Sequence, residues 1–123
     1  MKNQQFFSRF GFALRGMLRA WQRERSFRAQ SMFGLVVIAI GLFLPLSPVW
    51  WAVLALSIGL VLVLEMVNTA IELLCDVVHP GYAESIRDIK DIMAGGVLLA
   101  AVAAVITGLS MIYYYRAEFS SLF

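Results

Sequence analysis

The chain has 123 residues, of which 61% are apolar and 15% charged, with one cysteine and a net charge of +2. A soluble domain is usually about 45–50% apolar and about 25% charged, so a water-soluble enzyme of this size is nearly excluded. The single cysteine excludes a disulfide scaffold, the absence of glycine-rich phosphate motifs excludes a P-loop or Rossmann module, and the apolar content excludes disorder. An integral membrane protein of two to four spans remains.

A basic amphipathic helix is predicted over residues 5–28. Residues 1–30 carry seven basic side chains and one acid. At 100° per residue, the apolar side chains fall within an arc of about 140°, most arginines lie opposite, and Phe12 is the exception on the polar side. We expect this helix to lie on an anionic membrane surface, at least as an orienting anchor, and not to bind nucleic acid. Its apolar face comprises Phe6, Phe7, Phe10, Ala13, Leu14, Met17, Leu18 and Trp21.

The uncharged run from Ala29 to Leu64 is too long for one membrane span. As a single helix it would measure about 54 Å, against a hydrocarbon core about 30 Å thick. Pro45 and Pro48 divide the run into two. The predicted spans are 29–46, 49–78 and, after the turn His79-Pro80-Gly81, 84–115.

Three spans place the two ends of the chain on opposite sides of the membrane. Segments 1–28 and 79–91 share one side with nine Lys or Arg residues, whereas the other side has only Arg116. By the positive-inside rule, the side with nine basic residues is cytoplasmic. We therefore expect a multi-pass protein with a cytoplasmic N-terminus. The long basic segment also argues against a cleaved signal peptide.

Four polar side chains at the end of the second span share one helix face. Glu65, Asn68, Glu72 and Asp76 follow one another at spacings of three, four and four residues. On a helix these spacings give one narrow stripe. Measured from Val49, Glu65 lies about 24 Å along the helix and Glu72 about 34 Å, so the stripe crosses the cytoplasmic edge of the hydrocarbon. Oxygen ligands at such a boundary favour a hard divalent cation, above all Mg²⁺.

Glu65 must face protein, water or a partner, because an unpaired carboxylate in lipid is costly. Glu24 is a further acid, placed where the surface helix meets the first span. An alternative stays open: Glu72 and Asp76 solvate a helix end while Glu65 pairs with an arginine.

The third span begins with charged residues and continues with small ones. Lys90 is able to meet a phosphate as a point charge, and ordinary snorkelling at a helix start explains it equally well. Small residues repeating every four positions indicate close helix packing, and they are Gly96, Ala100, Ala104 and Gly108. We assign no chemistry to Cys75 or His79.

Together these features resemble the prokaryotic diacylglycerol kinase family, which includes the undecaprenol kinases. The resemblance covers roughly residues 10–112. It implies an all-α integral membrane protein with an N-terminal amphipathic surface helix plus three transmembrane helices. It also implies a homotrimeric helix bundle in the bacterial cytoplasmic (inner) membrane, with composite sites at the cytoplasmic boundary. The motifs that carry it are Glu24-Arg25-Ser26-Phe27-Arg28, Glu65-Met66-Val67-Asn68-Thr69-Ala70-Ile71-Glu72 and Lys90-Asp91-Ile92.

The resemblance also implies roles for individual residues. Glu65 matches the catalytic base and Asn68 a substrate-binding residue beside it, whereas Glu24 and Glu72 match the carboxylates that bind Mg²⁺ and ATP. Arg28 and, with a shift in alignment, Arg9 match substrate-binding positions. Gln30 stands where the family has an acid or histidine. The matches to nucleotide-binding positions are Asp76, Tyr82, Lys90, Asp91 and, in place of a tyrosine, Phe12.

The implied reaction is transfer of the ATP γ-phosphoryl group to diacylglycerol, giving phosphatidic acid, with undecaprenol as the alternative acceptor. The residues of the three motifs are more similar to the undecaprenol branch. The name of the family as a whole favours diacylglycerol. Two readings from other classes remain. A small transporter would have four spans and an acid in the first, and a pore former would need neither the acidic stripe nor the Lys-Asp pair.

Overall fold

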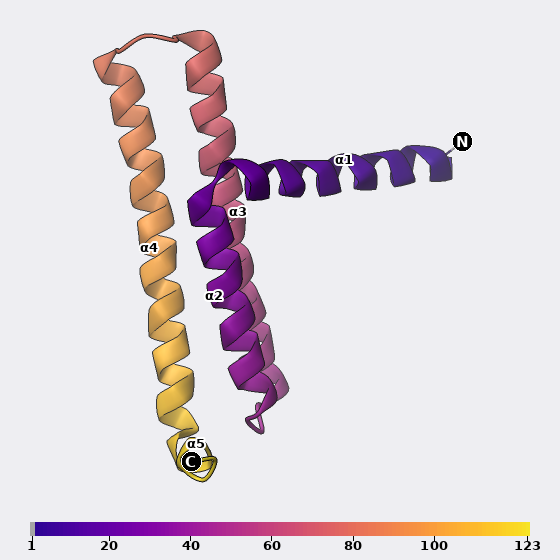
Figure 1. Cartoon of the computed structure of the whole chain (residues 1–123), viewed down its shortest axis with the longest axis vertical. Coiled ribbons are helices and arrows are strands. Elements are labelled where there is room, and N and C mark those ends of the chain that lie inside the picture. Colours follow the sequence, from indigo (N-terminus) through magenta and orange to yellow (C-terminus); the bar gives the residue numbers. More distant parts are fainter. Residues whose placement is uncertain (1) are drawn as a thin grey trace.

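The structure, a computed structural model, describes residues 2–123 as four long helices and one short one (Figure 1). No strand occurs among these residues, in agreement with the predicted all-α class. The helices are α1 (Lys2–Arg23), α2 (Arg25–Leu42), α3 (Pro48–Val78), α4 (Glu84–Tyr114) and α5 (Arg116–Ser120).

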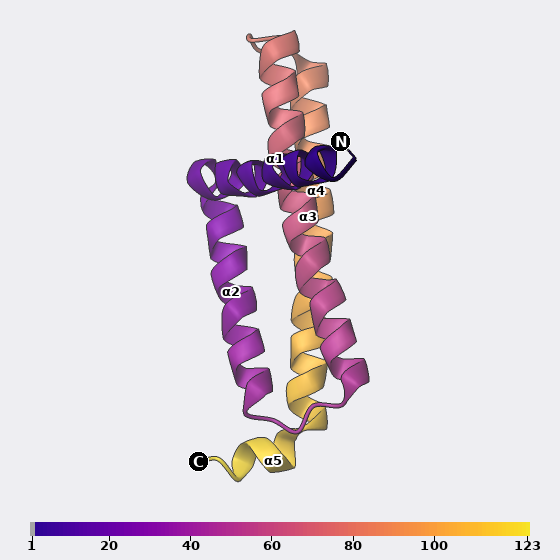
Figure 2. The same ribbon diagram turned by 90° about the vertical axis from the view of Figure 1, so that its right-hand side faces the viewer.

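Three of the long helices are aligned with one axis, and the fourth lies across them. α2, α3 and α4 run along the long axis of the molecule, whereas α1 runs crosswise and its N-terminal part projects away from the bundle (Figures 1 and 2). The most extensive contact joins α3 to α4, and α2 packs on α3. The ends of α3 and α4 that are joined by their short turn extend beyond the level of α1 (Figure 1).

The corner between α1 and α2 falls at Glu24, earlier than the boundary at residue 28 that the sequence predicted. Glu24 has an extended backbone, with φ −110° and ψ 115°. The side chain of Arg28 explains the earlier corner. Its Nη1 donates hydrogen bonds to the carbonyl oxygens of Trp21 (2.6 Å) and Gln22 (3.2 Å), so the segment 25–28 belongs to α2 and holds the end of α1.

The turn between α2 and α3 is set by proline and by a serine cap. α2 ends at Leu42, four residues before the predicted end of the first span, and α3 begins at Pro48, where the lack of a backbone N–H is harmless. The side chain of Ser47 accepts a hydrogen bond from the backbone N–H of Trp50. The backbone N–H of Ser47 donates to the Tyr115 hydroxyl over 3.1 Å, which ties this turn to the end of α4.

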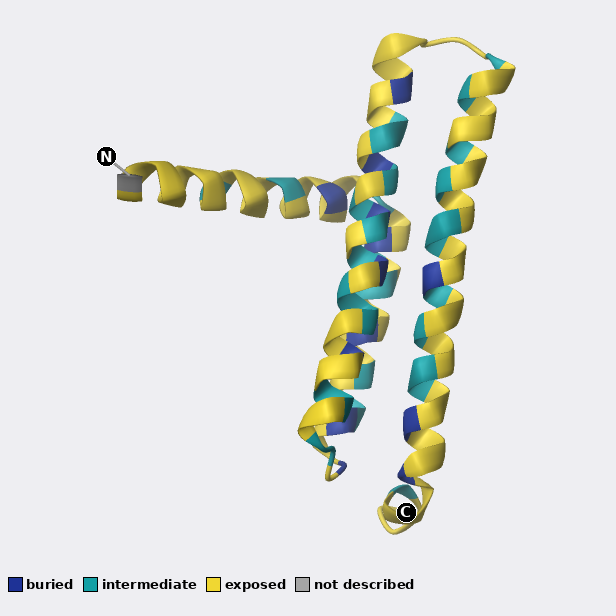
Figure 3. Cartoon of the chain, turned by 180° about the vertical axis from the view of Figure 1, so that it is seen from behind, coloured by how far each residue is buried: buried dark blue, intermediate teal, exposed yellow. Residues whose placement is uncertain are grey.

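The buried core lies at this same end of the bundle. Leu44, Leu54, Met111 and Tyr115 form one apolar cluster. Figure 3 shows the buried residues on the sides of the helices that face one another, while most of the outer surface is exposed. The exposed surface of α3 and α4 includes many large apolar side chains, which is typical of a surface covered by lipid or by other helices.

Two helices are long and apolar enough to span a membrane, namely α3 and α4. They match the predicted second and third spans to within a residue at each end. The helix expected to form the first span, α2, is not among them. Its 18 residues include Arg25 and Arg28 in its first turns. That α2 crosses the membrane, which would give three spans in all, therefore stays a prediction.

Candidate functional site

The polar stripe of α3 lies where α1 crosses the bundle. A cavity of about 570 Å³ separates the two helices at this level and is lined by residues between Gly16 and Arg23 of α1 and between Met66 and Leu73 of α3. Asn68 and Glu72 lie in the same stretch of α3 and Glu65 directly before it, and none of the three lines the cavity. The corner at Glu24 brings a further carboxylate to this level from the end of α1.

Glu65 is buried, with 5% of its surface exposed. The carboxylates of Glu24 and Glu72 are close enough to interact with it electrostatically. Among the described residues no ion pair includes Glu65, so the alternative in which it pairs with an arginine is not observed. One chain therefore shelters this carboxylate and brings two other acids, Glu24 and Glu72, near it.

Asn68 contributes an acceptor that has no donor. Its Oδ1 atom is buried and, within the described part of the chain, accepts no hydrogen bond. A buried polar atom without a partner is costly, which makes it a candidate for binding a group from outside the chain. Its neighbour Thr69 is also buried, and the Thr69 hydroxyl donates to the carbonyl oxygen of Glu65 over 3.0 Å.

The donor set around Glu65 fits a magnesium ion carried by a nucleotide better than a metal held by protein alone. In residues 2–123 no three His, Cys, Asp or Glu side chains are grouped closely enough to hold a metal ion. Mg²⁺ is usually bound by one or two carboxylates, with phosphate oxygens and water completing its octahedron. Glu24 and Glu72 are the two carboxylates near Glu65.

A second polar group lies at the turn between α3 and α4. Lys90 Nζ donates to Asp76 Oδ1 over 3.0 Å. The hydroxyl of Tyr82, which is 79% exposed, accepts a hydrogen bond from Arg87 over 3.4 Å. Asp91 is exposed directly after Lys90. Four of the residues that the resemblance assigns to the nucleotide thus lie near this turn, namely Asp76, Tyr82, Lys90 and Asp91.

Two predicted site residues stay apart from the acids. Arg9 and Phe12 are exposed and belong to the N-terminal half of α1, which projects away from the bundle (Figure 1). The guanidinium group of Arg15 lies over the Phe12 ring, 4.6 Å from its centroid. Within residues 2–123, neither Arg9 nor Phe12 is brought to Glu65.

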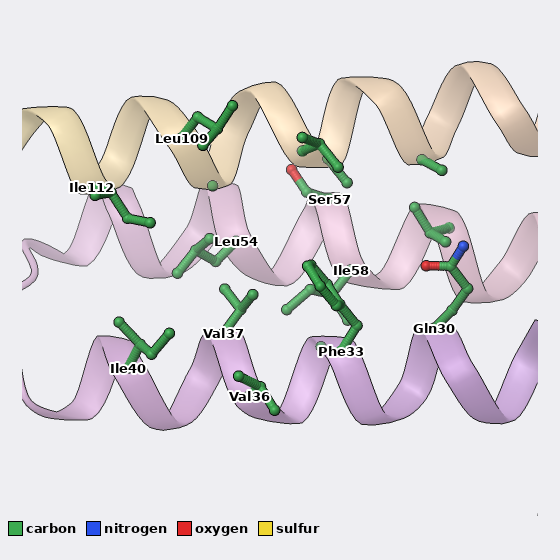
Figure 4. Close-up of a pocket in the computed structure, with 16 residues that line it drawn as sticks. Gln30, Phe33, Val36, Val37, Ile40, Leu54, Ser57, Ile58, Leu109 and Ile112 are labelled. Carbon is green, nitrogen blue, oxygen red and sulfur yellow. The ribbon is translucent and has the colours of Figure 1, made fainter.

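An apolar groove runs between α2, α3 and α4 (Figure 4). Its volume is about 360 Å³. Gln30 extends toward it from the start of α2, and Val61 lines it one helical turn before Glu65. Ser57, another polar lining residue, already donates a hydrogen bond to Thr107 over 3.4 Å. The groove therefore ends about one helical turn from Glu65.

Sequence reasoning missed three features of this region: the buried Thr69, the contact of Arg28 with the end of α1, and the pairing of Lys90 with Asp76. Thr69 lies four residues after Glu65, a spacing that would have indicated a shared helix face. The other two contacts cross a corner or a turn, and no spacing along a single helix indicates them.

The comparisons with known proteins agree on one family. The sequence profile described as prokaryotic diacylglycerol kinase matches residues 11–112. A diacylglycerol kinase of Synechocystis sp. is 43% identical over 100 residues, which span 80% of this chain and 57% of the relative's length. A diacylglycerol kinase of Escherichia coli is 32% identical over 79% of this chain and 80% of the relative. An undecaprenol kinase of Bacillus subtilis is 33% identical over 85% of both chains.

Proposed function

Because this chain belongs to the prokaryotic diacylglycerol kinase family, we propose that it is a lipid kinase that transfers the γ-phosphoryl group of ATP to diacylglycerol, giving phosphatidic acid. The observation that carries the proposal is the position of the acids. Glu65 lies between an apolar groove, suited to a lipid chain, and the polar turn between α3 and α4, suited to a nucleotide.

Glu65 is the proposed base. The apolar groove would hold a hydrocarbon chain of the lipid and place its primary hydroxyl one turn beyond Val61, beside the Glu65 carboxylate. Glu65 would accept the hydroxyl proton as the oxygen attacks the γ-phosphorus. The unpartnered Oδ1 of Asn68 would accept a hydrogen bond from the polar end of the lipid.

Glu24 and Glu72 are the proposed ligands of Mg²⁺, which enters with ATP and neutralises charge on the phosphates. Phosphoryl transfer depends mainly on positioning and charge stabilisation, so a site assembled from helix ends is sufficient. Asp76 lies one helical turn beyond Glu72, and Lys90 is hydrogen-bonded to Asp76. This arrangement supports a nucleotide whose phosphates would reach Glu72. Tyr82 and Asp91 would complete the nucleotide contacts.

The assembly is proposed to be a homotrimer, as the resemblance implies. The exposed apolar faces of α3 and α4 offer surface for neighbouring copies. Arg9 and Phe12, which project away from their own acids, would serve the lipid and the nucleotide of a neighbouring subunit. Crosslinking in detergent followed by native mass spectrometry tests this. Three copies are expected, and a monomer would contradict the assembly.

The proposed location is the bacterial inner membrane, with α2, α3 and α4 as three spans, α1 on the cytoplasmic surface, and the turn between α3 and α4 in the cytoplasm. The apolar side chains of α1 are exposed along its length, including Phe6, Phe10 and Leu18. A membrane surface would cover them. Arg25 and Arg28 at the start of α2 would then lie at the headgroups, where arginine is favourable.

Undecaprenol is a second candidate acceptor, because the Bacillus subtilis relative named undecaprenol kinase is about as similar as the Escherichia coli diacylglycerol kinase. The deciding experiment presents ATP labelled at the γ-phosphate to the purified protein in mixed micelles with either lipid. Label in phosphatidic acid is expected. Label only in undecaprenyl phosphate would show that undecaprenol is the acceptor. Label in neither lipid would contradict the kinase proposal and favour a transporter or pore former.

A further inference from the structure

The corner between α1 and α2 is closed by the side chain of Arg28. Its Nη1 atom donates to two backbone carbonyls of the last turn of α1, those of Trp21 (2.6 Å) and Gln22 (3.2 Å). Backbone bonds flank the corner on both sides: Glu24 N–H donates to Ala20, and Arg28 N–H donates to Glu24. The guanidinium group therefore joins two helices at the one non-helical residue between them.

Arginine suits this position for a physical reason. The last carbonyls of a helix have no helical donor, and the helix dipole makes that end negative. A guanidinium group supplies both hydrogens and positive charge, in a planar geometry that a lysine ammonium does not reproduce. With both Nη1 hydrogens engaged, the end of α1 is held in a fixed direction relative to α2.

Glu24 depends on this corner. In the sequence, Glu24 lies between Arg28 and the two residues whose carbonyls Arg28 binds. The Glu24 side chain makes no capping hydrogen bond to α2. Its carboxylate is within electrostatic range of Glu65, a like charge that would drive a free side chain away. The backbone geometry of the corner sets where the Glu24 side chain starts relative to α2.

We propose that Arg28 is a positioning residue: it fixes the corner and thereby holds Glu24 toward Glu65 and Glu72. The inference rests on the proposed function, because Glu24 matters to the reaction only as a ligand of the nucleotide-bound magnesium. It differs from the substrate-binding role that the resemblance implies for Arg28. A positioning role predicts a change in the magnesium requirement, whereas a lipid contact predicts a change in the KM for lipid.

The kinetic test compares Arg28→Lys with Arg25→Lys. Arg25 is exposed at the same corner, and its side chain makes no hydrogen bond within the described residues. We expect Arg28→Lys to raise the Mg²⁺ concentration for half-maximal rate about tenfold or more, because small misplacements of catalytic groups have large effects. The KM for lipid should stay within about twofold, as should both constants of Arg25→Lys. A change in the lipid KM alone would overturn the proposal.

A double variant separates positioning from general damage. In a Glu24→Gln background, Arg28→Lys should not raise the magnesium requirement further, because the group that it positions is already gone. A further increase of the same size as in the wild type would show that Arg28 acts on another group and would overturn the proposal.

A spectroscopic test does not need activity. Spin labels are attached at Leu14→Cys in α1 and Met32→Cys in α2, both exposed positions, in a Cys75→Ser background diluted with unlabelled chains. The distance distribution should broaden with Arg28→Lys and not with Arg25→Lys. An unchanged distance distribution in Arg28→Lys would overturn the proposal that Arg28 fixes the corner. If the wild type phosphorylates neither lipid while the broadening is seen, the proposed function fails and the corner contact stands.

Discussion

The Lys90 ammonium group donates a hydrogen bond to Asp76 Oδ1 over 3.0 Å and so joins the end of α3 to the start of α4. Both side chains are well exposed, with 36% and 64% of their surfaces accessible. Exposed ion pairs contribute little to stability. The pair therefore contributes little to the stability of the fold. It does place a cation beside Asp76, one helical turn beyond Glu72.

Replacing Lys90 by methionine should weaken ATP binding without unfolding the protein. The variant removes the positive charge that the proposed site offers to the nucleotide phosphates, and we expect the KM for ATP to rise about tenfold or more. Lys90→Arg, which keeps the charge, should lose much less. Thermal unfolding in detergent should be nearly unchanged for both. A normal KM in the methionine variant would remove Lys90 from the nucleotide site.

Glu65→Gln and Glu72→Gln should fail in different ways. Glu65 is buried near the apolar groove, and loss of a general base typically lowers kcat by about 10²–10⁴-fold. Its affinity for Mg²⁺-ATP should stay near normal. Glu72→Gln should instead weaken Mg²⁺-ATP binding, with partial recovery of the rate at high Mg²⁺.

The measurement for both acids is kcat and Mg²⁺-ATP affinity in mixed micelles, with Glu84→Gln as the control. Glu84 is an exposed acid at the start of α4, with 81% of its side-chain surface accessible. Its amide variant should behave as wild type. Near-normal turnover in Glu65→Gln, or loss of ATP affinity alone, would show that Glu65 is not the base.

Gly34 should tolerate no side chain, because α2 and α3 approach closely there. A Cβ atom at this position would lie 2.9 Å from Cγ2 of Ile58. We expect Gly34→Ala to destabilise the bundle by about 1–3 kcal/mol through overpacking. Gly59→Ala, whose Cβ would meet nothing within 4 Å, is the matched control and should be neutral.

Denaturant titration in detergent measures both glycine variants. Adding Ile58→Ala to Gly34→Ala should recover part of the loss, because it removes the methyl group that collides. Equal stability of Gly34→Ala and Gly59→Ala would mean that the two helices do not pack at this distance.

A reporter fused after Phe123 should be active only outside the cytoplasm. Nine Lys or Arg residues in segments 1–28 and 79–91 favour the cytoplasmic side, against Arg116 on the other. A second fusion in the turn near Gly81 should report the cytoplasm. Cytoplasmic activity of the Phe123 fusion would mean an even number of spans, and α2 would then lie on the surface instead of crossing the membrane.

The helical class, the approximate helix bounds and the acidic stripe of α3 were predictable from the sequence. These features follow from local causes: uncharged runs long enough for a bilayer, prolines that interrupt them, and the spacing of Glu65, Asn68 and Glu72 on one helix. The roles of these residues came from the resemblance to a family, which the profile match over residues 11–112 confirms as a family assignment. The roles themselves stay predictions.

The remaining features were decided by contacts between segments. The corner at Glu24 depends on a side chain reaching back across the bend, and the pairing of Lys90 with Asp76 joins residues 14 apart across a turn. The burial of Glu65 and the unpartnered oxygen of Asn68 depend on how α3 is covered by its neighbours. Periodicity assigns a residue to a face of its own helix. Periodicity does not say which helix covers that face or at what distance. The packing of the helices decides both, and it thereby decides which polar atoms find partners.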